Sequence, residues 1–458
     1  MTPIQLNKDL IKKFTISGPR YTSYPTAPQW EAFTPTDYEK VLNAYGQTND
    51  ALSLYIHIPF CHTMCYYCGC NVEIRRKNGS VGDSYVGYLA KEMALVTNAI
   101  QKKPNVKQLH LGGGTPNFLT ADQLSTLMDH IKSHFNILPE SEIAIEIDPR
   151  TVQTNQLETL KTLGFNRISM GIQDFDPKVQ KAINRIQPLE SIQSLMKDLR
   201  SLHFDNINMD LIYGLPHQSP SSFKTTIEEV ISLKPERIAL YSYAHVPWLK
   251  SHQCLIKEDD LPTADQKLEI FLQARKQFTS SRYKAIAMDH FACETDELAT
   301  AFESGTLFRN FMGYTTKPAN HFIGLGATSI GYVAGAFVQN VHQVSDYQKA
   351  LDQGKLATQK GLTLSKDDLI RQSVIQDLMC KFTIKKATLD NRFGILFDQY
   401  FLDAKTHLDT CEKEGLIQQS ESDIRLTELG KLFVRNICIG FDKYFRKSQS
   451  KQQYSKTI

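Results

Sequence analysis

Short apolar segments alternate with amphipathic ones between about residues 51 and 250. Most of the apolar segments are continuous, which is typical of strands covered on both faces of a parallel sheet. The segments between them have helical spacing, as in Tyr85–Ile100, Asp122–Phe135 and Leu189–Leu202. The predicted strands are Leu52–Ile58, Val106–Leu111, Glu142–Ile147, Arg167–Ile172, Ile207–Ile212 and Arg237–Tyr243. Six strand–helix units predict an α/β fold, an incomplete (βα)6 barrel with right-handed crossovers and an open lateral mouth.

The predicted barrel is flanked by two segments of different character. Residues 1–50 are polar with interleaved aromatic residues, as in Pro19–Pro25, and we expect this N-terminal segment to clasp a flat ligand. Residues 51–361 form the predicted barrel domain with an extension, and the chain is helix-rich from about residue 362. A β-turn-β pattern from Leu416 onward makes residues 362–458 similar to a winged helix. We interpret this C-terminal part as a lid domain; DNA binding is the weaker alternative, because lysine and arginine are not gathered on one helix.

Polar residues and glycines lie in the predicted strands near their ends or just past them. The carboxyl ends of the strands in a parallel α/β barrel carry the active site, so we expect these residues to share one rim. They are His57, Gly112–Thr115, Glu146, Asp148, Gln173, Asp174, Asp210, Ala244 and His245. Six strands that direct polar groups to the same rim favour an enzyme.

Composition limits the class of protein further. The 458 residues have a mass of 52.1 kDa, which predicts two or three domains, and the net charge of +3 gives no nucleic-acid signal. The longest uncharged stretch, residues 323–338, is short for a membrane span and holds four glycines, so we expect buried glycine-rich structure. The first nine residues contain no apolar core of a signal peptide. Nine cysteines, an odd number with four of them crowded together, argue against a disulfide framework. We therefore expect a cytoplasmic protein with neither a membrane span nor a nucleic-acid partner.

Four cysteines lie within ten residues, and three of them form a C-x3-C-x2-C pattern: Cys61, Cys65 and Cys68. A cubane 4Fe–4S cluster ordinarily takes four thiolates, so three would leave one iron open to a small molecule. The alternative is a zinc knuckle that recruits a fourth ligand from elsewhere in the chain. Cys70 could be a fourth cluster ligand, but a C-x-C pair would strain to reach two corners of one cubane. We expect Cys70 to lie close to the site without binding iron.

The other rim residues have structural as well as functional interpretations. Gly112–Gly114 could form only a tight turn, but glycines there would also let the backbone approach a ligand closely. Glu146 and Asp210 lie in predicted strands, where a carboxylate is costly to bury without a partner. They could form buried ion pairs or could hydrogen-bond a ligand. Gln173 and Arg185 are more ambiguous, since Arg185 could be an ordinary surface residue.

These residues resemble the radical S-adenosylmethionine superfamily, of which the C-x3-C-x2-C loop is the signature. Within it, the chain is similar to the oxygen-independent coproporphyrinogen III oxidases, also called coproporphyrinogen dehydrogenases, over nearly its whole length. The similar segments are Gly18–Pro25, His57–His62, Cys68–Cys70, Leu111–Pro116, Glu146–Arg150, Ser169–Phe175, Asp210–Pro216, Tyr243–His245, Met288–Ala292, Arg309–Asn310, Gly313–Thr316 and Arg435–Cys438.

The resemblance implies cofactors and the residues that bind them. It implies one 4Fe–4S cluster on Cys61, Cys65 and Cys68, with an open iron that chelates S-adenosylmethionine, and a second S-adenosylmethionine beside it. We place Cys70 among the catalytic residues. The residues implied to line the S-adenosylmethionine sites are Tyr55, Gly113, Gly114, Thr115, Glu146, Gln173, Arg185, Asp210, Ala244 and Ile330.

The resemblance also implies a reaction. A 5′-deoxyadenosyl radical would abstract a β-hydrogen from a substrate propionate, and loss of CO2 would leave a vinyl group. Two rounds would convert coproporphyrinogen III into protoporphyrinogen IX in haem biosynthesis. We expect a monomer that receives electrons from a reductant such as flavodoxin or ferredoxin, with Arg20 and Arg309 as carboxylate partners. The main alternative is a haem-binding chaperone of the same superfamily, which typically lacks Cys70 and the long N-terminal segment present here.

Overall fold

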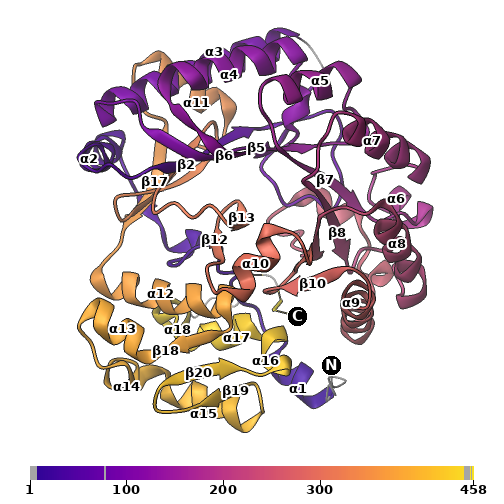
Figure 1. The fold of residues 1–458 in the computed structure, drawn as a ribbon, viewed down its shortest axis with the longest axis vertical. Coiled ribbons are helices and arrows are strands. Elements are labelled where there is room, and N and C mark those ends of the chain that lie inside the picture. The colour runs from indigo at the N-terminus through magenta and orange to yellow at the C-terminus, as the bar shows by residue number, and fades with distance from the viewer. Residues whose placement is uncertain (1–7, 77–78, 448–453, 455, 458) are drawn as a thin grey trace.

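The computed structural model describes residues 8–76, 79–447, 454 and 456–457 of the chain. The first seven residues, to which the expectation about a signal peptide largely applies, lie outside this range. Figure 1 shows an α/β body that carries the predicted barrel, with the C-terminal helices gathered beneath it.

Six parallel strands form the centre of the main sheet, in the order in which they occur along the chain. They are β2 (Leu52–Ile58), β5 (Asn105–Gly113), β6 (Asn136–Ile147), β7 (Arg167–Gln173), β8 (Ile207–Tyr213) and β9 (Arg237–Ser242). All six predicted strands are therefore confirmed. Ile58 of β2 lies opposite Gly113 of β5, so the cysteine-bearing segment and the glycine turn leave the sheet side by side.

The sheet continues beyond these six strands at both edges and does not close into a barrel. Beyond β2, β14 (Phe322–Leu325) runs parallel to it, and the antiparallel strands β15 (Ile330–Val333), β16 (Ala336–Asn340), β17 (Thr358–Thr363) and β1 (Glu31–Ala32) follow. Beyond β9 lie antiparallel β11 (His290–Cys293) and β10 (Tyr283–Ile286). The result is an open sheet of 13 strands with β1 and β10 at its edges. The added strands are two to six residues long and gave no distinct pattern in the sequence.

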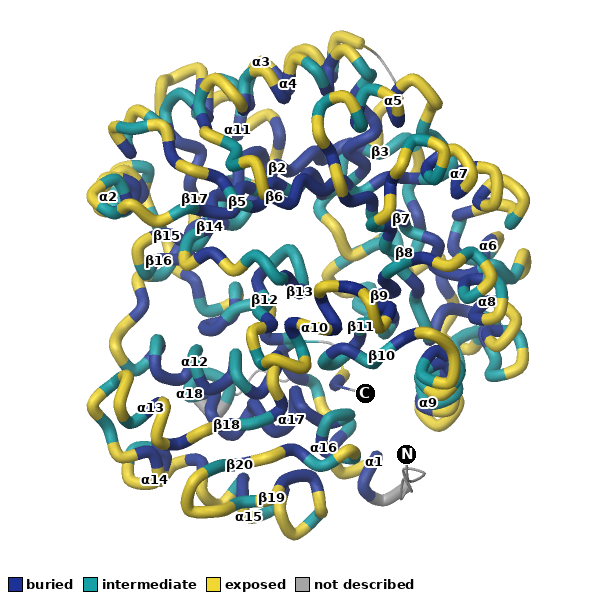
Figure 2. Tube along the Cα trace, viewed as in Figure 1, coloured by how far each residue is buried: buried dark blue, intermediate teal, exposed yellow. Residues whose placement is uncertain are grey.

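Helices cover the outer face of the sheet, as Figure 2 shows by their exposed outer sides and the buried strands beneath them. They are α2 (Pro35–Gly46), α3 (Gly79–Ile100), α4 (Ala121–His134), α5 (Thr154–Thr162), α6 (Pro177–Ala182), α7 (Leu189–Ser201), α8 (Pro220–Leu233), α9 (Ala264–Thr279) and α11 (Val344–Asp352). Helix α10 (Glu297–Glu303) packs against β10 and β11 and lies toward the middle of the molecule in Figure 1. Thr120 and Ser219 begin α4 and α8 with side-chain caps, which satisfy otherwise free backbone N–H groups. Each fully buried Leu or Ile between helix and strand contributes about 1.5–3 kcal/mol of hydrophobic stabilisation.

The glycine-rich stretch of residues 323–338 is largely buried, with Ala334 exposed at the turn between β15 and β16, and it includes most of β14, β15 and β16. Glu92 of α3 holds this stretch in place from the helix-covered face of the sheet. Its carboxylate accepts hydrogen bonds from Gly326 N (2.7 Å), Asn340 Nδ2 (2.6 Å) and Tyr347 Oη (2.7 Å), and burial raises its pKa. Among the described residues, no helix has both the length and the apolar character that crossing a membrane requires.

A second hydrophobic core lies in the C-terminal part. Its helices are α12 (Lys366–Lys381), α13 (Lys386–Phe393), α14 (Phe397–Tyr400), α15 (Lys405–Lys413), α16 (Glu428–Leu432), α17 (Val434–Ile439) and α18 (Lys443–Lys447). The sheet is β18 (Thr383–Lys385), β20 (Asp423–Leu426) and β19 (Ile417–Gln419), in that order. The predicted β-turn-β unit is thus β19–β20, extended by a short strand that the sequence did not reveal.

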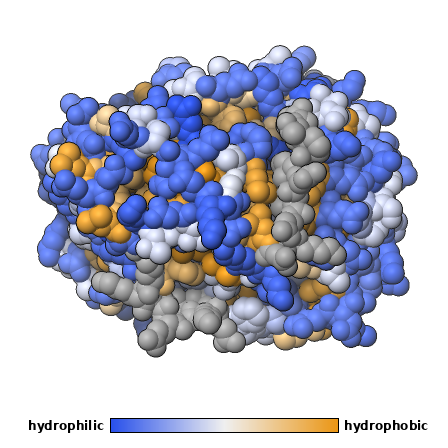
Figure 3. All heavy atoms as spheres, turned by 90° about the horizontal axis from the view of Figure 1, so that it is seen from below, coloured by the Kyte–Doolittle hydropathy of each residue, from blue (hydrophilic) through white to orange (hydrophobic). Residues whose placement is uncertain are grey.

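The N-terminal segment joins this second core, which the sequence did not predict. Helix α1 (Lys8–Phe14) packs Leu10 and Phe14 among the C-terminal helices, and the Phe14 ring meets Phe433 edge to face at 5.6 Å. The domain boundaries at residues 50 and 361 stay predictions. Figure 3 views the molecule from the side of the C-terminal helices and shows a mostly hydrophilic surface with scattered hydrophobic areas.

The remaining short elements lie in connections. They are the 3-10 helices Ala27–Gln29, Pro116–Phe118, Ser251–Leu255, Glu258–Asp260 and Leu402–Ala404, and the strand pairs β3 (Phe60–Cys61) with β4 (Glu73–Ile74) and β12 (Phe308–Asn310) with β13 (Gly313–Thr315).

Candidate active site

The cysteine loop, residues 61–70, leaves the carboxyl end of β2 and is held by neighbouring segments. Its backbone carbonyl oxygens at Tyr67, Cys68 and Cys70 hydrogen-bond side chains of the segment after β9. These are Gln253 Nε2 (3.0 Å), His252 Nε2 (2.7 Å) and Lys250 Nζ (3.0 Å). The loop therefore has a defined conformation set by residues far away in the sequence.

Polar groups surround the first two thiols of the pattern. Cys61 Sγ lies 3.3 Å from the Thr115 hydroxyl, and Cys65 Sγ lies 3.6 Å from Arg150 Nη2 and 3.7 Å from Arg185 Nη1. Hydrogen bonds and cations of this kind stabilise a thiolate. Cys65 therefore lies beside two guanidinium groups, which come from different segments of the chain.

Cys70 lies next to Cys68, with its side chain exposed. The hydrogen bond from Cys70 lowers the pKa of Cys68 to about 6, and this neighbour raises the pKa of Cys70 well above its ordinary value. Cys70 is thus close to the predicted ligands, as expected, and is the member of the pair that keeps its proton.

A first group of predicted rim residues gathers around Glu146. Its carboxylate contacts His110 Nε2 at 3.1 Å and accepts from Gly113 N at 3.3 Å. The Tyr55 ring stacks on His110 with a centroid separation of 5.9 Å, and its hydroxyl meets His57 Nδ1 at 3.1 Å. The Glu146 side chain is 44% exposed, so it is not in a buried ion pair and is accessible to a ligand.

The glycine turn approaches both this group and the cysteine loop. A Cβ on Gly113 would lie 2.8 Å from the His57 ring, and one on Gly114 would lie 2.9 Å from Phe60 O and 3.1 Å from Cys61 Sγ. Gly113 also has a positive φ of 120°. The absence of side chains here is required by close packing, and it brings Thr115 against Cys61.

A second group lies at the end of β7. Arg185 is 6% exposed and donates to Gly171 O at 2.7 Å, so the interpretation as a surface arginine is wrong. Gln173 is 7% exposed with a φ of 67°, and its Oε1 has no hydrogen-bond partner among the described residues. A buried, unpartnered amide oxygen costs free energy unless a ligand or water satisfies it.

Asp210 of β8 lies opposite Gly171 of β7. Its carboxylate accepts from Asn208 Nδ2 at 2.8 Å and from the Ser169 hydroxyl at 3.4 Å. Burial and the negative charge of Glu146 raise its pKa to about 6. Among the described residues it forms no ion pair, which leaves its charge available to a ligand.

Ala244 and Ile330 complete the predicted set from opposite sides of the rim. Ala244 follows β9 between Tyr243 and His245, whose side chains are joined by a hydrogen bond of 2.9 Å. Ile330 begins β15 and packs against the cluster around Trp30.

The sequence reasoning missed the roles of His110 and Arg150. Arg150 donates to Asp148 Oδ2 at 2.6 Å, and together with the charge of Arg185 this contact holds the pKa of Asp148 low, although burial alone would raise it. Arg150 lies in a segment with recognised similarity to the family, but nothing in its spacing revealed its contact with Cys65. His110 is the last polar residue of β5 before the glycines, and only the strand register pairs it with Tyr55.

Comparison with known proteins agrees with this geometry. Residues 55–230 match the Radical SAM superfamily and residues 364–433 match the HemN C-terminal domain. The chain is 43% identical to the oxygen-independent coproporphyrinogen III oxidase of Pseudomonas aeruginosa, with 99% of each chain covered. It is 40% identical to that of Escherichia coli, with 98% of each covered.

The chain belongs to the oxygen-independent coproporphyrinogen III oxidase family.

The solved structure of the Escherichia coli family member, described as the radical SAM enzyme HemN, superimposes with a TM-score of 0.90. The two chains are 39% identical, and the match covers 96% of this chain and 99% of that one. The α/β fold with an open radical SAM sheet and a helix-rich C-terminal part is thereby confirmed.

Membership of the radical SAM superfamily implies a 4Fe–4S cluster and S-adenosylmethionine, and the donor set fits this. No group of three or more His, Cys, Asp or Glu side chains converges on a single-ion site in the part of the chain that the structure describes. A single zinc ion needs such convergence, whereas a cubane takes one thiolate at each of several irons. Three separate thiols on one loop, one of them beside two guanidinium groups, suit the cluster better than a lone ion.

Proposed function

We propose that this protein catalyses the oxygen-independent oxidation of coproporphyrinogen III in haem biosynthesis, converting two propionates into vinyl groups to give protoporphyrinogen IX. The observation that carries the proposal is the single rim on which the three-cysteine loop, the glycine turn and two carboxylates meet. Full-length similarity to coproporphyrinogen III oxidases supplies the substrate.

We assign the cluster to Cys61, Cys65 and Cys68, with one iron left open. Burial raises the pKa of Cys61 to about 11, so loading at neutral pH releases a proton from this thiol. Cys70 is not a ligand in this assignment. Its exposed thiol beside Cys68 places it where it can contact the substrate or donate a proton.

Two groups of rim residues support two S-adenosylmethionine molecules. Gly113, Gly114 and Thr115 offer backbone groups beside Cys61, with Tyr55 and Glu146 next to them. Gln173, Arg185 and Asp210 form the second group. Among the described residues, the amide oxygen of Gln173 has no hydrogen-bond partner and the Asp210 carboxylate has no ion-pair partner, so both can accept from a ligand. Ammonium and ribose hydroxyl groups are donors of this kind. Ala244 and Ile330 would border the sites from the flanking strands.

When bound, the cluster supplies the one-electron chemistry that cleaves S-adenosylmethionine and removes a β-hydrogen from a propionate. The chain's own task is to position the substrate and exclude water. The N-terminal segment is tied to the barrel by Arg20 Nη2 on Ser242 O (3.2 Å) and to the C-terminal part by Tyr21 Oη on Asp442 (3.1 Å). This cross-linking supports the role of the N-terminal segment as a clasp and of the C-terminal helices as a lid.

We further propose that the enzyme acts as a cytoplasmic monomer and receives electrons from a small reductant such as flavodoxin or ferredoxin. The reaction requires such a donor, because the residues that hold the cluster supply no electron themselves.

The test is anaerobic turnover by cluster-reconstituted protein with reductant, S-adenosylmethionine and coproporphyrinogen III. We expect protoporphyrinogen IX and 5′-deoxyadenosine from the wild type and neither product from Cys65→Ala. Cys254→Ala is the matched control, because Cys254 is an exposed cysteine outside the pattern. Tight haem binding without turnover would instead favour the chaperone.

A further inference from the structure

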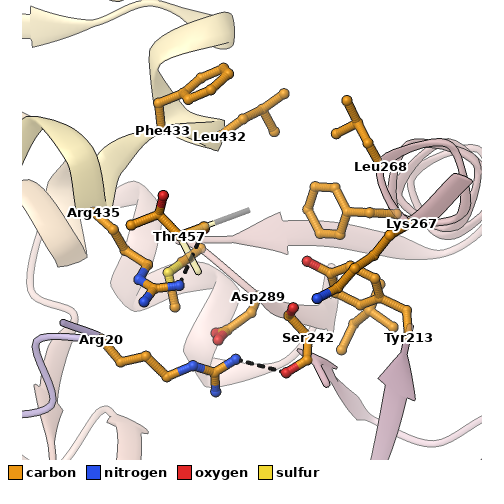
Figure 4. Close-up of a pocket in the computed structure, with 13 residues that line it drawn as sticks. Arg20, Tyr213, Ser242, Lys267, Leu268, Asp289, Leu432, Phe433, Arg435 and Thr457 are labelled. Atoms are coloured by element: carbon orange, nitrogen blue, oxygen red, sulfur yellow. Dashed lines mark hydrogen bonds between the residues drawn. The ribbon is translucent and has the colours of Figure 1, made fainter. Parts of the chain in front are cut away.

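A cavity of about 60 Å³ lies where four parts of the chain meet, near the carboxyl ends of β8 and β9. Figure 4 shows Arg20 from the N-terminal segment, Tyr213 and Ser242 from the strand ends, and Lys267 from α9 around it. The C-terminal part contributes Arg435. None of these cationic residues belongs to the S-adenosylmethionine sites assigned above.

Three cations line this cavity, and no carboxylate pairs with any of them among the described residues. Arg435 is 5% exposed, and within the described part of the chain its guanidinium donates only to backbone carbonyl oxygens, among them Pro19 O at 2.9 Å and Thr457 O at 3.2 Å. Lys267 Nζ donates to Tyr243 O at 3.0 Å. Arg20 Nη2 donates to Ser242 O at 3.2 Å, and its buried Nε has no partner.

Asp289 is the one acid among the residues that line the cavity, and it is already engaged elsewhere. Its carboxylate lies 2.7 Å from His290 Nδ1, and although burial opposes ionisation, this contact and the charges of Arg309 and Arg20 lower its pKa to about 2. Among the residues that the structure describes, those lining the cavity therefore carry an excess of positive charge. Burial, together with the charges of neighbouring cations, lowers the pKa of Lys267 to about 8 and that of Arg435 to about 9.

Buried cations without a counter-ion are rare in proteins, because removing a charge from water costs several kcal/mol. An anionic ligand would remove this cost. Figure 4 shows Leu268, Leu432 and Phe433 on the opposite, apolar wall of the cavity. Cations that face an apolar wall suit a ligand in which a carboxylate is attached to a short hydrocarbon chain. The small volume of the cavity suits such a side chain of a ligand, whereas a whole macrocycle would not fit.

Arg20 stands between this cavity and the inside of the barrel. Its guanidinium carbon lies 5.9 Å from the centroid of the Tyr241 ring. Asp210 is opposite Ala239 of β9, and Tyr241 is two residues further along the same strand, so Asp210 and Tyr241 face the same side of the sheet. Leu240 and Ser242, which line the cavity, alternate with Tyr241 along β9 and so face the other side of the sheet. Arg20 connects the two sides at the end of β9, because it contacts both Ser242 O and the Tyr241 ring.

We propose that this cavity binds a propionate carboxylate of the tetrapyrrole substrate that is not the one reacting, and that Lys267, Arg20 and Arg435 are its positioning residues. This inference rests on the proposed function for the identity of the ligand. Anchoring one propionate here would fix the orientation of the macrocycle over the rim.

The experiment compares Lys267→Met with Lys276→Met, an exposed lysine on the same helix, in reconstituted enzyme. We expect Lys267→Met to raise the KM for coproporphyrinogen III about 10-fold to 100-fold, because the substrate loses a charge-assisted hydrogen bond. The KM of Lys276→Met should change little. Cluster absorbance and uncoupled 5′-deoxyadenosine formation should match the wild type. Lys267→Arg should recover most of the affinity, because it restores the charge.

A KM for Lys267→Met within twofold of that for Lys276→Met would overturn the inference. If Lys267→Met fails to fold, Arg20→Gln tests the same prediction, because it removes another of the three cations. The backbone carbonyl of residue 20 can still accept the hydrogen bond from Arg309. Binding of coproporphyrin III, the unreactive oxidised form, is measured in parallel by fluorescence. If the porphyrin binds tightly, this binding depends on Lys267 and no turnover occurs, the proposed function is rejected but the cavity assignment is not. If turnover is normal and does not depend on Lys267, the cavity assignment is rejected but the proposed function is not.

Discussion

Asp210→Asn is expected to make the cluster-free protein more stable at neutral pH while weakening S-adenosylmethionine binding. Asp210 has its pKa raised from 3.8 to about 6 by burial and by Glu146. A carboxyl group whose folded-state pKa is raised destabilises the fold once it ionises. The cost is absent below pH 4, develops between pH 4 and 6, and is complete above pH 6.

The size of the effect follows from the shift. About two pKa units correspond to at most about 3 kcal/mol, and partial solvation reduces this to about 1–3 kcal/mol. Asparagine is nearly isosteric, and its amide oxygen can still accept from Asn208. The variant should therefore gain about 1–3 kcal/mol in the free energy of unfolding at pH 7.5 and almost nothing at pH 4.

Urea unfolding at the two pH values measures this difference, with Asp205→Asn as the control because Asp205 is exposed just before β8. In reconstituted protein, Asp210→Asn should weaken S-adenosylmethionine binding by about one to two decades. A stability change of the same sign and size at both pH values, together with an unchanged dissociation constant, would refute the reasoning and make Asp210 a structural residue.

Three further variants test other parts of the site. Alanine at any of the three predicted ligand cysteines should abolish the absorbance of the 4Fe–4S cluster, whereas Cys70→Ser should keep the absorbance and lose turnover. If Cys70→Ser loses as much iron as the alanine variants, Cys70 is a cluster ligand. Gly114→Ala places a Cβ 3.1 Å from Cys61 Sγ and should lower the iron content after reconstitution, while Gly69→Ala, with open space around it, should not. Glu146→Ala should keep the cluster and weaken S-adenosylmethionine binding about 10-fold to 100-fold; unchanged binding by calorimetry would assign Glu146 a role with His110 only.

The sequence predicted the parallel centre of the sheet because its strands are buried on both faces and carry a continuous apolar pattern. The edge strands escaped prediction because β1 and β10 are two and four residues long and are defined by their partners. A strand of two residues has no periodicity to detect. Such a strand forms because it pairs with its neighbour at the edge of the sheet, and not because its own residues favour a strand.

The residues at the rim were predictable for the same reason, since the apolar pattern locates the ends of the strands. Contacts between segments distant in the sequence were not predictable. Arg435 reaches the carbonyl of Pro19 across 416 positions of the chain, and Arg150 reaches Cys65 across 85. No spacing rule links such residues, so the shared core of the two ends and the cationic cavity became visible only in three dimensions.

The most direct test of the central claim is the stoichiometry of anaerobic turnover with limiting coproporphyrinogen III. The account predicts two molecules of 5′-deoxyadenosine and two of CO2 for each protoporphyrinogen IX, because each propionate requires one round. Formation of 5′-deoxyadenosine without any protoporphyrinogen IX, in protein with a complete cluster, would contradict it.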